Sequence, residues 1–242
     1  IDAVARYQKI LEHRNRQLKA LADGRISKLS DDFEVWTAEL CQWGAKVIHN
    51  RIHSVDKSVE KIREFYDKIA KQNAKINIRY QSDIFGELRY GLPSESSLEL
   101  IGRALTSKLE TLSKKESFLG STMAGPHRDD LEITMDGNFL KAFGSQGEVR
   151  SLVLALRLTE VELFKSVQQS NPILLIDDFS SELDSQRRDF LLDYLAAGDS
   201  QVFLSTTENL RLGKKFEVKA GKISGHIGEH EYDDRLNTDR QQ

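Results

Sequence analysis

Two adjacent carboxylates, Asp177 and Asp178, directly follow the apolar segment 172–176. A continuous apolar run of this length is typical of a buried parallel strand, and open α/β sheets bind ligands at the carboxyl ends of such strands. In a nucleotide site one carboxylate can hold Mg²⁺ while the next orients or deprotonates the attacking water. An aspartate-rich turn after a strand would give the same pattern, so the catalytic role is a hypothesis.

A second candidate lies in the segment 143–148, which reads FGSQGE and precedes an expected helix. The residues of interest are Ser145, Gln146, Gly147 and Glu148. Small residues and a hydroxyl at a helix amino terminus leave backbone N–H groups at the positive end of the helix dipole, which suits a phosphate. Ser145 and Glu148 also stand three residues apart, so the segment taken alone is better explained by an ordinary capping box.

The third candidate is the segment 181–184, which reads SELD and leads into another expected helix. Taken alone it predicts little, because Asp184 could simply be the N-cap of that helix. The order of the three segments along the chain therefore carries as much information as their content.

The elements around these residues predict an α/β fold with a long helical arm. Helical spacing predicts helices over 1–22, from about 33 to 73, from 96 to about 116, over 147–168 and over 185–196. Apolar segments and alternation predict strands over 76–80, 131–135, 139–143, 173–176 and 202–204. The helix after FGSQGE is apolar around most of its circumference, so we expect it to be buried.

Composition separates the chain into three parts. We predict a helical arm domain over 1–95, an ATPase-type lobe over 96–225, and a polar tail over 226–242 whose charge is typical of disorder. The break between the first two parts contains Gly91 and Pro93. The chain also opens at Ile1 inside a helical pattern, without an initiator methionine or a signal segment, so we expect a fragment.

Charge and cysteine content exclude several classes of protein. The 242 residues carry a formal net charge of −3, so any contact with nucleic acid must come from local patches. Basic residues of the second helix alternate with acidic ones, which favours a solvated face. A single cysteine, Cys41, cannot form an internal disulfide, and no run reaches the roughly 18 apolar residues of a membrane span. We therefore expect a cytoplasmic protein with no membrane partner.

Read together, the three segments resemble the second half of an ABC-type ATPase head, with its signature loop, Walker B strand and D-loop in that order. Within that superfamily three features resemble the RecF family of recombination mediators, which is related to SMC proteins. These features are the GPHRDD sequence at 125–130, the FGSQGE form of the signature and the Asp-Asp end of the Walker B strand. The opening segment 7–19 also resembles the start of the RecF arm.

This resemblance implies roles for individual residues. Ser145 and Gly147 would touch the γ-phosphate of ATP held by a partner subunit, so ATP would join a homodimer. Asp177 would bind Mg²⁺, Asp178 would replace the usual catalytic glutamate, and Asp184 would couple the two sites. Thr206 or the threonine after it would replace the switch histidine of many ABC heads. The roles of His127 and Arg128 stay open between a nucleotide or DNA surface and a structural pair of Arg128 with Asp129 or Asp130.

The resemblance further implies a nucleoid-associated DNA-repair ATPase that binds DNA at gaps, works with recombination mediator proteins and helps to load recombinase. No G-x-x-x-x-G-K-[ST] loop occurs in the 242 residues, so we expect this chain alone to be inactive and to hold ATP poorly. Two alternatives remain: another SMC-like repair ATPase, which would need a longer coiled coil, and a non-catalytic interaction module that binds through its arm.

Overall fold

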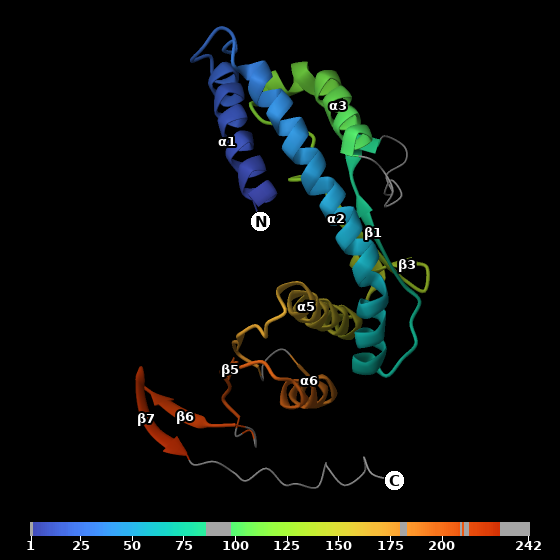
Figure 1. The fold of residues 1–242 in the computed structure, drawn as a ribbon, viewed down its shortest axis with the longest axis vertical. Coiled ribbons are helices and arrows are strands. Elements are labelled where there is room, and N and C mark those ends of the chain that lie inside the picture. Colours follow the sequence, from blue (N-terminus) through green and yellow to red (C-terminus); the bar gives the residue numbers. More distant parts are fainter. Residues whose placement is uncertain (1, 86–97, 180–182, 209, 211–212, 228–242) are drawn as a thin grey trace. The chain divides into compact units, whose positions relative to one another are not determined.

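The computed structural model describes residues 2–85, 98–179, 183–208, 210 and 213–227. The chain divides into two compact units, Ile1–Glu160 and Val161–Gln242 (Figure 1). The division falls inside helix α5, which spans Gln146–Gln168. Among the described helices none is both long and apolar enough to cross a membrane.

Two long helices form the first part of unit 1, as the sequence predicts. Helix α1 spans Asp2–Ala22 and helix α2 spans Phe33–Ala70, with a short connection that reverses the chain (Figure 1). At about 1.5 Å per residue, the 38 residues of α2 extend on the order of 57 Å. The helix ends where Lys71 adopts a left-handed conformation with φ 51°, three residues before the predicted end.

Helix α3, Leu98–Leu119, packs against both α1 and α2. Its buried side chains Ile101, Leu105 and Leu109 join one hydrophobic cluster with residues of the other two helices. Gly44 permits this close packing, because a Cβ atom there would lie 2.7 Å from Leu105 Cδ2. Unit 1 therefore continues past residue 95, where the sequence predicted the arm to end, since the next helix buries its apolar face against the arm.

A small antiparallel sheet of order β1-β2-β3 completes the described strands of unit 1. Strand β1, Ile76–Gln81, pairs with β2, Asp130–Met135, and a turn with positive φ at Asp136 and Gly137 leads to β3, Asn138–Phe139. The predicted returning strand 139–143 is wrong beyond its first residue. Leu140 turns inward and is buried, and Leu140–Phe143 forms the short helix α4 instead.

Helix α5 is less buried than its apolar composition predicts. One stripe is covered, formed by Ser151, Leu152, Ala155, Leu158 and Thr159. Other apolar side chains of the helix remain exposed, among them Val153 at 51% and Val167 at 74%. The expectation of a buried helix is therefore confirmed for one face only, because the described residues leave the other apolar side chains of α5 exposed.

Unit 2 contains a strand–helix–strand unit and a hairpin. Strand β4, Leu174–Ile176, pairs in parallel with β5, Val202–Leu204, and helix α6, Ser185–Ala197, connects them. The paired residues Leu175 and Phe203 are 78% and 54% exposed, so described residues leave one face of this parallel sheet uncovered.

The hairpin of unit 2 was not predicted. It joins β6, Lys215–Lys219, to β7, Lys222–Ile227, through Ala220 and Gly221, which both have positive φ. Strand β7 thus takes the first two residues of the predicted polar tail. The remainder of that tail and the predicted break at 91–93 lie outside the described residues.

Candidate nucleotide site

Asp177 and Asp178 lie at the carboxyl end of β4, where the sequence predicts a ligand site. The hydroxyl of Ser205, which directly follows the parallel strand β5, donates to Asp177 Oδ1 at 2.5 Å. The backbone N–H of Asp178 donates to the same hydroxyl at 2.9 Å. Ser205 therefore ties the two carboxylate-bearing residues to the neighbouring strand, and it was missing from the predicted site.

The backbone around these aspartates continues the parallel ladder beyond the two strands. Ser205 N donates to Ile176 O at 2.9 Å, and Phe179 N donates to Ser205 O at 3.1 Å. Asp178 has φ 50°, a left-handed conformation that is uncommon outside glycine. Such a backbone often marks a functional site, because surrounding contacts must hold it in place. Here the Ser205 contacts and buried Phe179 provide that support.

The exposed carboxylates of Asp177 and Asp178 fit a partial magnesium site. No group of three or more potential metal-binding side chains gathers anywhere in the described parts of the chain. Magnesium in nucleotide sites is commonly held by only one or two protein carboxylates, with water and phosphate oxygens completing its shell. The donor set at the end of β4 is compatible with that mode and not with an all-protein cage.

The FGSQGE segment forms a capping box at the start of α5. Glu148 Oε2 accepts from Ser145 N at 2.7 Å and from Ser145 Oγ at 2.8 Å, while Glu148 N donates to Ser145 Oγ at 3.2 Å. The hydrogen bonds from the Ser145 backbone and hydroxyl hold the pKa of Glu148 below its usual range. The capping box that the sequence allowed is therefore formed, and Gln146 and Gly147 lie in the first turn of the helix.

Gly144 has a structural reason to be glycine. A Cβ atom at this position would lie 2.6 Å from Leu140 O and 2.7 Å from Leu140 Cδ1. The glycine N–H also donates to Leu140 O at 2.8 Å. The absence of a side chain therefore lets the chain pass closely over α4 and enter α5.

Asp184 is the N-cap of α6. Its Oδ1 accepts from Arg187 N at 3.0 Å, and its other oxygen forms an ion pair with the Arg187 guanidinium. Thr206 Oγ1 accepts from Glu208 N at 3.1 Å, and Glu208 in turn pairs with Arg188 of α6 at 2.5 Å. Of the D-loop-like segment, only the residues from 183 onward lie within the described part of the chain.

The signature-like residues belong to unit 1, whereas Asp177, Asp178, Asp184 and Thr206 belong to unit 2. Within unit 2 the structure brings Asp177 and Asp178 together with Ser205. The joint action of the two groups of residues stays a prediction.

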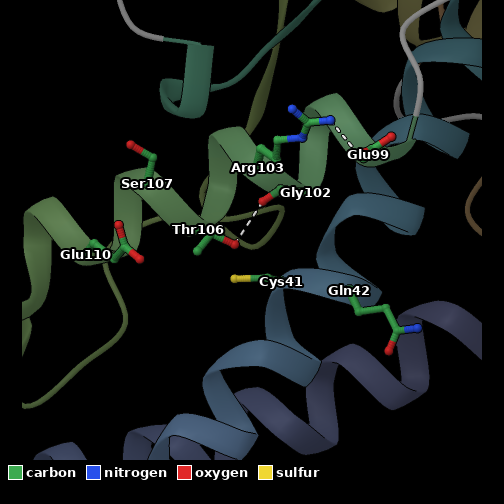
Figure 2. Close-up of a pocket in the computed structure, with 8 residues that line it drawn as sticks. All are labelled: Cys41, Gln42, Glu99, Gly102, Arg103, Thr106, Ser107 and Glu110. Atoms are coloured by element: carbon green, nitrogen blue, oxygen red, sulfur yellow. Dashed lines mark hydrogen bonds and ion pairs between the residues drawn. The ribbon is translucent and has the colours of Figure 1, made fainter.

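A separate groove lies between α2 and α3, with a volume of about 470 Å³ (Figure 2). It is lined by Cys41, Gln42, Glu99, Gly102, Arg103, Thr106, Ser107 and Glu110. Burial raises the pKa of the Cys41 thiol, which opposes thiolate chemistry there. None of the predicted nucleotide-site residues lines this groove.

Comparison with known proteins bears on the fold of the chain. No family model matches the chain. Over 93% of its length the chain superposes on a solved structure described as the recombination mediator protein RecF-ATPrS in the RecFOR pathway, with TM-score 0.78 and 27% identity. A second structure, of RecF-ATP, gives TM-score 0.74 and 26% identity over 92% of the chain. The fold is that of an ABC-type ATPase.

The curated relatives of the chain share one name. The chain is 35% identical over 224 residues to the DNA replication and repair protein RecF of Geotalea uraniireducens, and 37% identical over 226 residues to that of Halothermothrix orenii. Each alignment covers 90% of the chain and 58% of the relative. The chain is therefore similar to RecF proteins over 90% of its own length, and it spans somewhat more than half the length of these relatives.

Proposed function

We propose that this chain is the part of a RecF-type ATPase that carries the signature, Walker B and D-loop residues. The observation that carries the proposal is the Ser205 hydroxyl, which bonds both the Asp177 carboxylate and the Asp178 backbone at the edge of the parallel sheet. The relatives' remaining segment would supply the phosphate-binding loop, which does not occur among the 242 residues.

In this proposal Asp177 would coordinate Mg²⁺, and the ion would neutralise phosphate charge during phosphoryl transfer. Asp178 orients the attacking water and accepts its proton. An aspartate reaches one methylene less than a glutamate, so the left-handed backbone at Asp178 matters for placing its carboxylate. Because phosphoryl transfer depends mainly on positioning, a loss of the Ser205 contacts would slow hydrolysis more than it weakens ATP binding.

The start of α5 would receive the γ-phosphate of ATP bound to a second subunit. The residues involved are Ser145, Gln146, Gly147 and Glu148. The Ser145 hydroxyl now donates to Glu148, so it must turn away from that carboxylate to donate to a phosphate oxygen. The positive end of the α5 dipole favours that exchange. Two copies would then close on two ATP molecules, with Asp184 coupling the sites and Thr206 sensing the γ-phosphate.

The wider role follows from the relatives. Their names describe a DNA replication and repair protein and a recombination mediator of the RecFOR pathway. We propose the same role here: ATP-dependent dimers that bind DNA at single-strand gaps, contact other mediator proteins and help recombinase to load.

The Asp178→Asn substitution tests this proposal in the full-length protein, meaning this chain joined to the segment with the phosphate-binding loop. The amide cannot accept the proton of the attacking water, so hydrolysis should fall at least about a hundredfold while the ATP-bound dimer persists. Turnover can be followed by phosphate release and dimerisation by light scattering. Normal turnover in this variant would remove Asp178 from its proposed role.

A further inference from the structure

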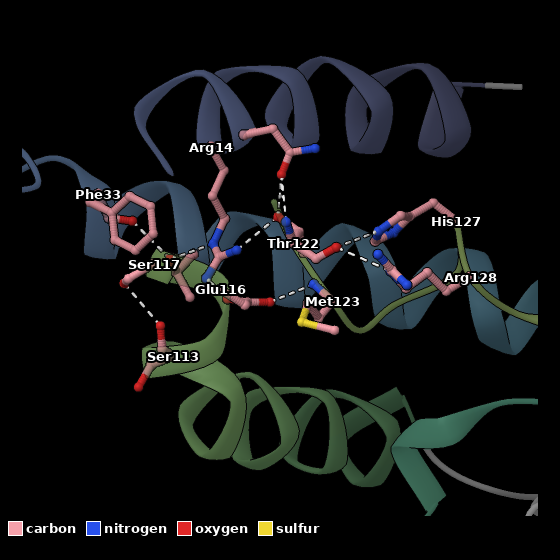
Figure 3. Close-up of polar contacts among 11 residues, drawn as sticks. Arg14, Phe33, Ser113, Glu116, Ser117, Thr122, Met123, His127 and Arg128 are labelled. Carbon is pink, nitrogen blue, oxygen red and sulfur yellow. Dashed lines mark hydrogen bonds and ion pairs between the residues drawn. The ribbon is translucent and has the colours of Figure 1, made fainter. Parts of the chain in front are cut away.

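The turn between α3 and β2 is fixed by a buried polar cluster (Figure 3). Arg14 of α1 forms an ion pair with Glu116 of α3 at 2.6 Å, and the two side chains are only 3% and 0% exposed. Arg14 also donates to Thr122 Oγ1 at 2.8 Å. The second oxygen of Glu116 accepts from Met123 N at 2.6 Å. Two helices therefore hold the first residues of the turn through buried charges.

Asn15, next to Arg14 on α1, also binds Thr122. Asn15 Oδ1 accepts from Thr122 N at 2.8 Å and from Thr122 Oγ1 at 2.6 Å. On the other side, Arg51 of α2 donates to Pro126 O at 2.5 Å. Each of the three long helices thus fixes part of the segment 122–126.

His127 forms hydrogen bonds that connect the turn to α1. A carbonyl oxygen only accepts, so the 3.2 Å contact with Thr122 O requires the proton on His127 Nε2. Nδ1 then accepts from the Tyr7 hydroxyl at 2.6 Å. Burial lowers the pKa of His127, which favours this neutral form. Gly125 has φ 126°, and a Cβ atom there would lie 2.5 Å from the Tyr7 oxygen, so no larger residue fits.

Arg128 follows this fixed turn and is exposed. Its Nε donates to Thr122 O at 3.2 Å, and its two terminal nitrogens have no partner among the described residues. The adjacent carboxylates are engaged elsewhere. Asp129 accepts from the Tyr80 and Ser82 hydroxyls, while Asp130 accepts from Leu131 N and lies 3.9 Å from Lys141 Nζ. The structural pair of Arg128 with Asp129 or Asp130, one of the two alternatives that the sequence left open, does not form among the described residues.

We propose that Arg128 is a phosphate-binding residue whose ligand is the backbone of a nucleic acid. A guanidinium held at Nε presents its terminal nitrogens as a fork that matches two phosphate oxygens. The turn would remain fixed by Arg14, Glu116 and His127 without this side chain, so folding alone does not account for an unpaired arginine here. An exposed site with one arginine favours a polyanion that contacts several basic residues at once over a small free phosphate.

This inference deepens the DNA-binding part of the proposed function and is independent of the nucleotide site. It is tested with the full chain, a short fluorescein-labelled DNA duplex and fluorescence anisotropy at several salt concentrations. Arg128→Gln should weaken binding by about tenfold and lower the slope of log K against log salt by about one, which is the loss of one phosphate contact. Arg128→Lys should retain the salt slope but bind more weakly than the unchanged chain.

The matched control is Arg103→Gln, which removes the same charge from an exposed arginine of α3 that already pairs with Glu99. It should change neither affinity nor slope. Thermal unfolding should be the same for the unchanged chain and for the Arg128 variants, which separates lost binding from lost folding. Pyrophosphate and ATP are added as competitors of the labelled DNA, to distinguish a nucleic-acid phosphate from a free phosphate as the ligand of Arg128.

Three results would overturn the assignment. The first is that Arg128→Gln binds DNA with the affinity and salt slope of the unchanged chain. This result would show that Arg128 does not contact DNA, and it would not contradict DNA binding by other residues. The second is that Arg128→Gln loses binding of ATP or pyrophosphate but still binds DNA like the unchanged chain. This result would assign Arg128 to a free phosphate ligand. The third is no DNA binding by the unchanged chain, which removes both this inference and the DNA-binding part of the function while leaving ATP-dependent dimerisation untouched.

Discussion

Ser205 Oγ donates to Asp177 Oδ1 at 2.5 Å, so the loop after β5 holds the metal-binding candidate at the end of β4. The same hydroxyl accepts from the backbone N–H of Asp178. One side chain thus sets the position of the proposed metal ligand and of the proposed general base.

Replacement of Ser205 tests that relationship. Ser205→Ala removes both hydrogen bonds, and we expect kcat for ATP hydrolysis by the full-length protein to fall about tenfold, because a hydrogen bond to a charged group contributes about 1.5 kcal/mol or more. KM for ATP should change little. Ser205→Thr retains the hydroxyl and should restore most of the activity. An equal fall in both variants, or a rise in KM alone, would contradict the positioning role.

The buried pair of Arg14 and Glu116 should be important for stability. Arg14→Met leaves the Glu116 carboxylate buried without its cation, which costs about 3–5 kcal/mol of unfolding free energy. Urea denaturation of the full chain measures the change. Arg103→Gln, which breaks an exposed pair, should cost no more than about 1 kcal/mol. Similar losses in the two variants would show that the Arg14 pair is not part of the folded core.

His127 should make the chain less stable under mildly acidic conditions. Burial lowers the pKa of His127 in the folded chain, whereas the unfolded chain keeps the ordinary value of about 6.5. Between these two values the unfolded chain binds more protons, so the stability present above about pH 6.5 is lost as the pH falls toward the folded pKa.

Denaturation of His127→Gln at a series of pH values isolates this effect. The variant should lose less stability on acidification than the unchanged chain does, whatever its stability at neutral pH. His53→Gln, a change at a histidine of α2 outside the turn 122–127, should leave the pH dependence as it was. A pH dependence of His127→Gln that matches the unchanged chain would exclude His127 as the responsible group.

Local patterns predicted the long elements of the fold well. The apolar stripe and the Asp-Gly stop predicted α1 with its end at Ala22, and the apolar run before Asp177 predicted β4. These elements follow periodicities that the residues carry themselves. The motif order also predicted the resemblance to RecF, which the comparisons confirm.

Features that depend on distant residues were not predicted. The Ser205–Asp177 bond joins residues 28 positions apart, and the Arg14–Glu116 pair joins residues 102 positions apart. Residues 140–143 became a helix because Leu140 is buried, which alternation alone does not show. The β6–β7 hairpin did carry a local signal, since Phe216 and Val218 alternate ahead of Ala220-Gly221, although we predicted no strand in that part of the lobe.

The central claim, that the start of α5 receives the ATP of a second subunit, is tested most directly by Ser145→Arg. The measurement is light scattering of the full-length protein with and without ATP. The account predicts an ATP-dependent dimer for the unchanged protein and for Ser113→Arg, the same substitution on the exposed face of α3, and a monomer for Ser145→Arg. Dimerisation of Ser145→Arg at the ATP concentration that suffices for the unchanged protein would contradict it.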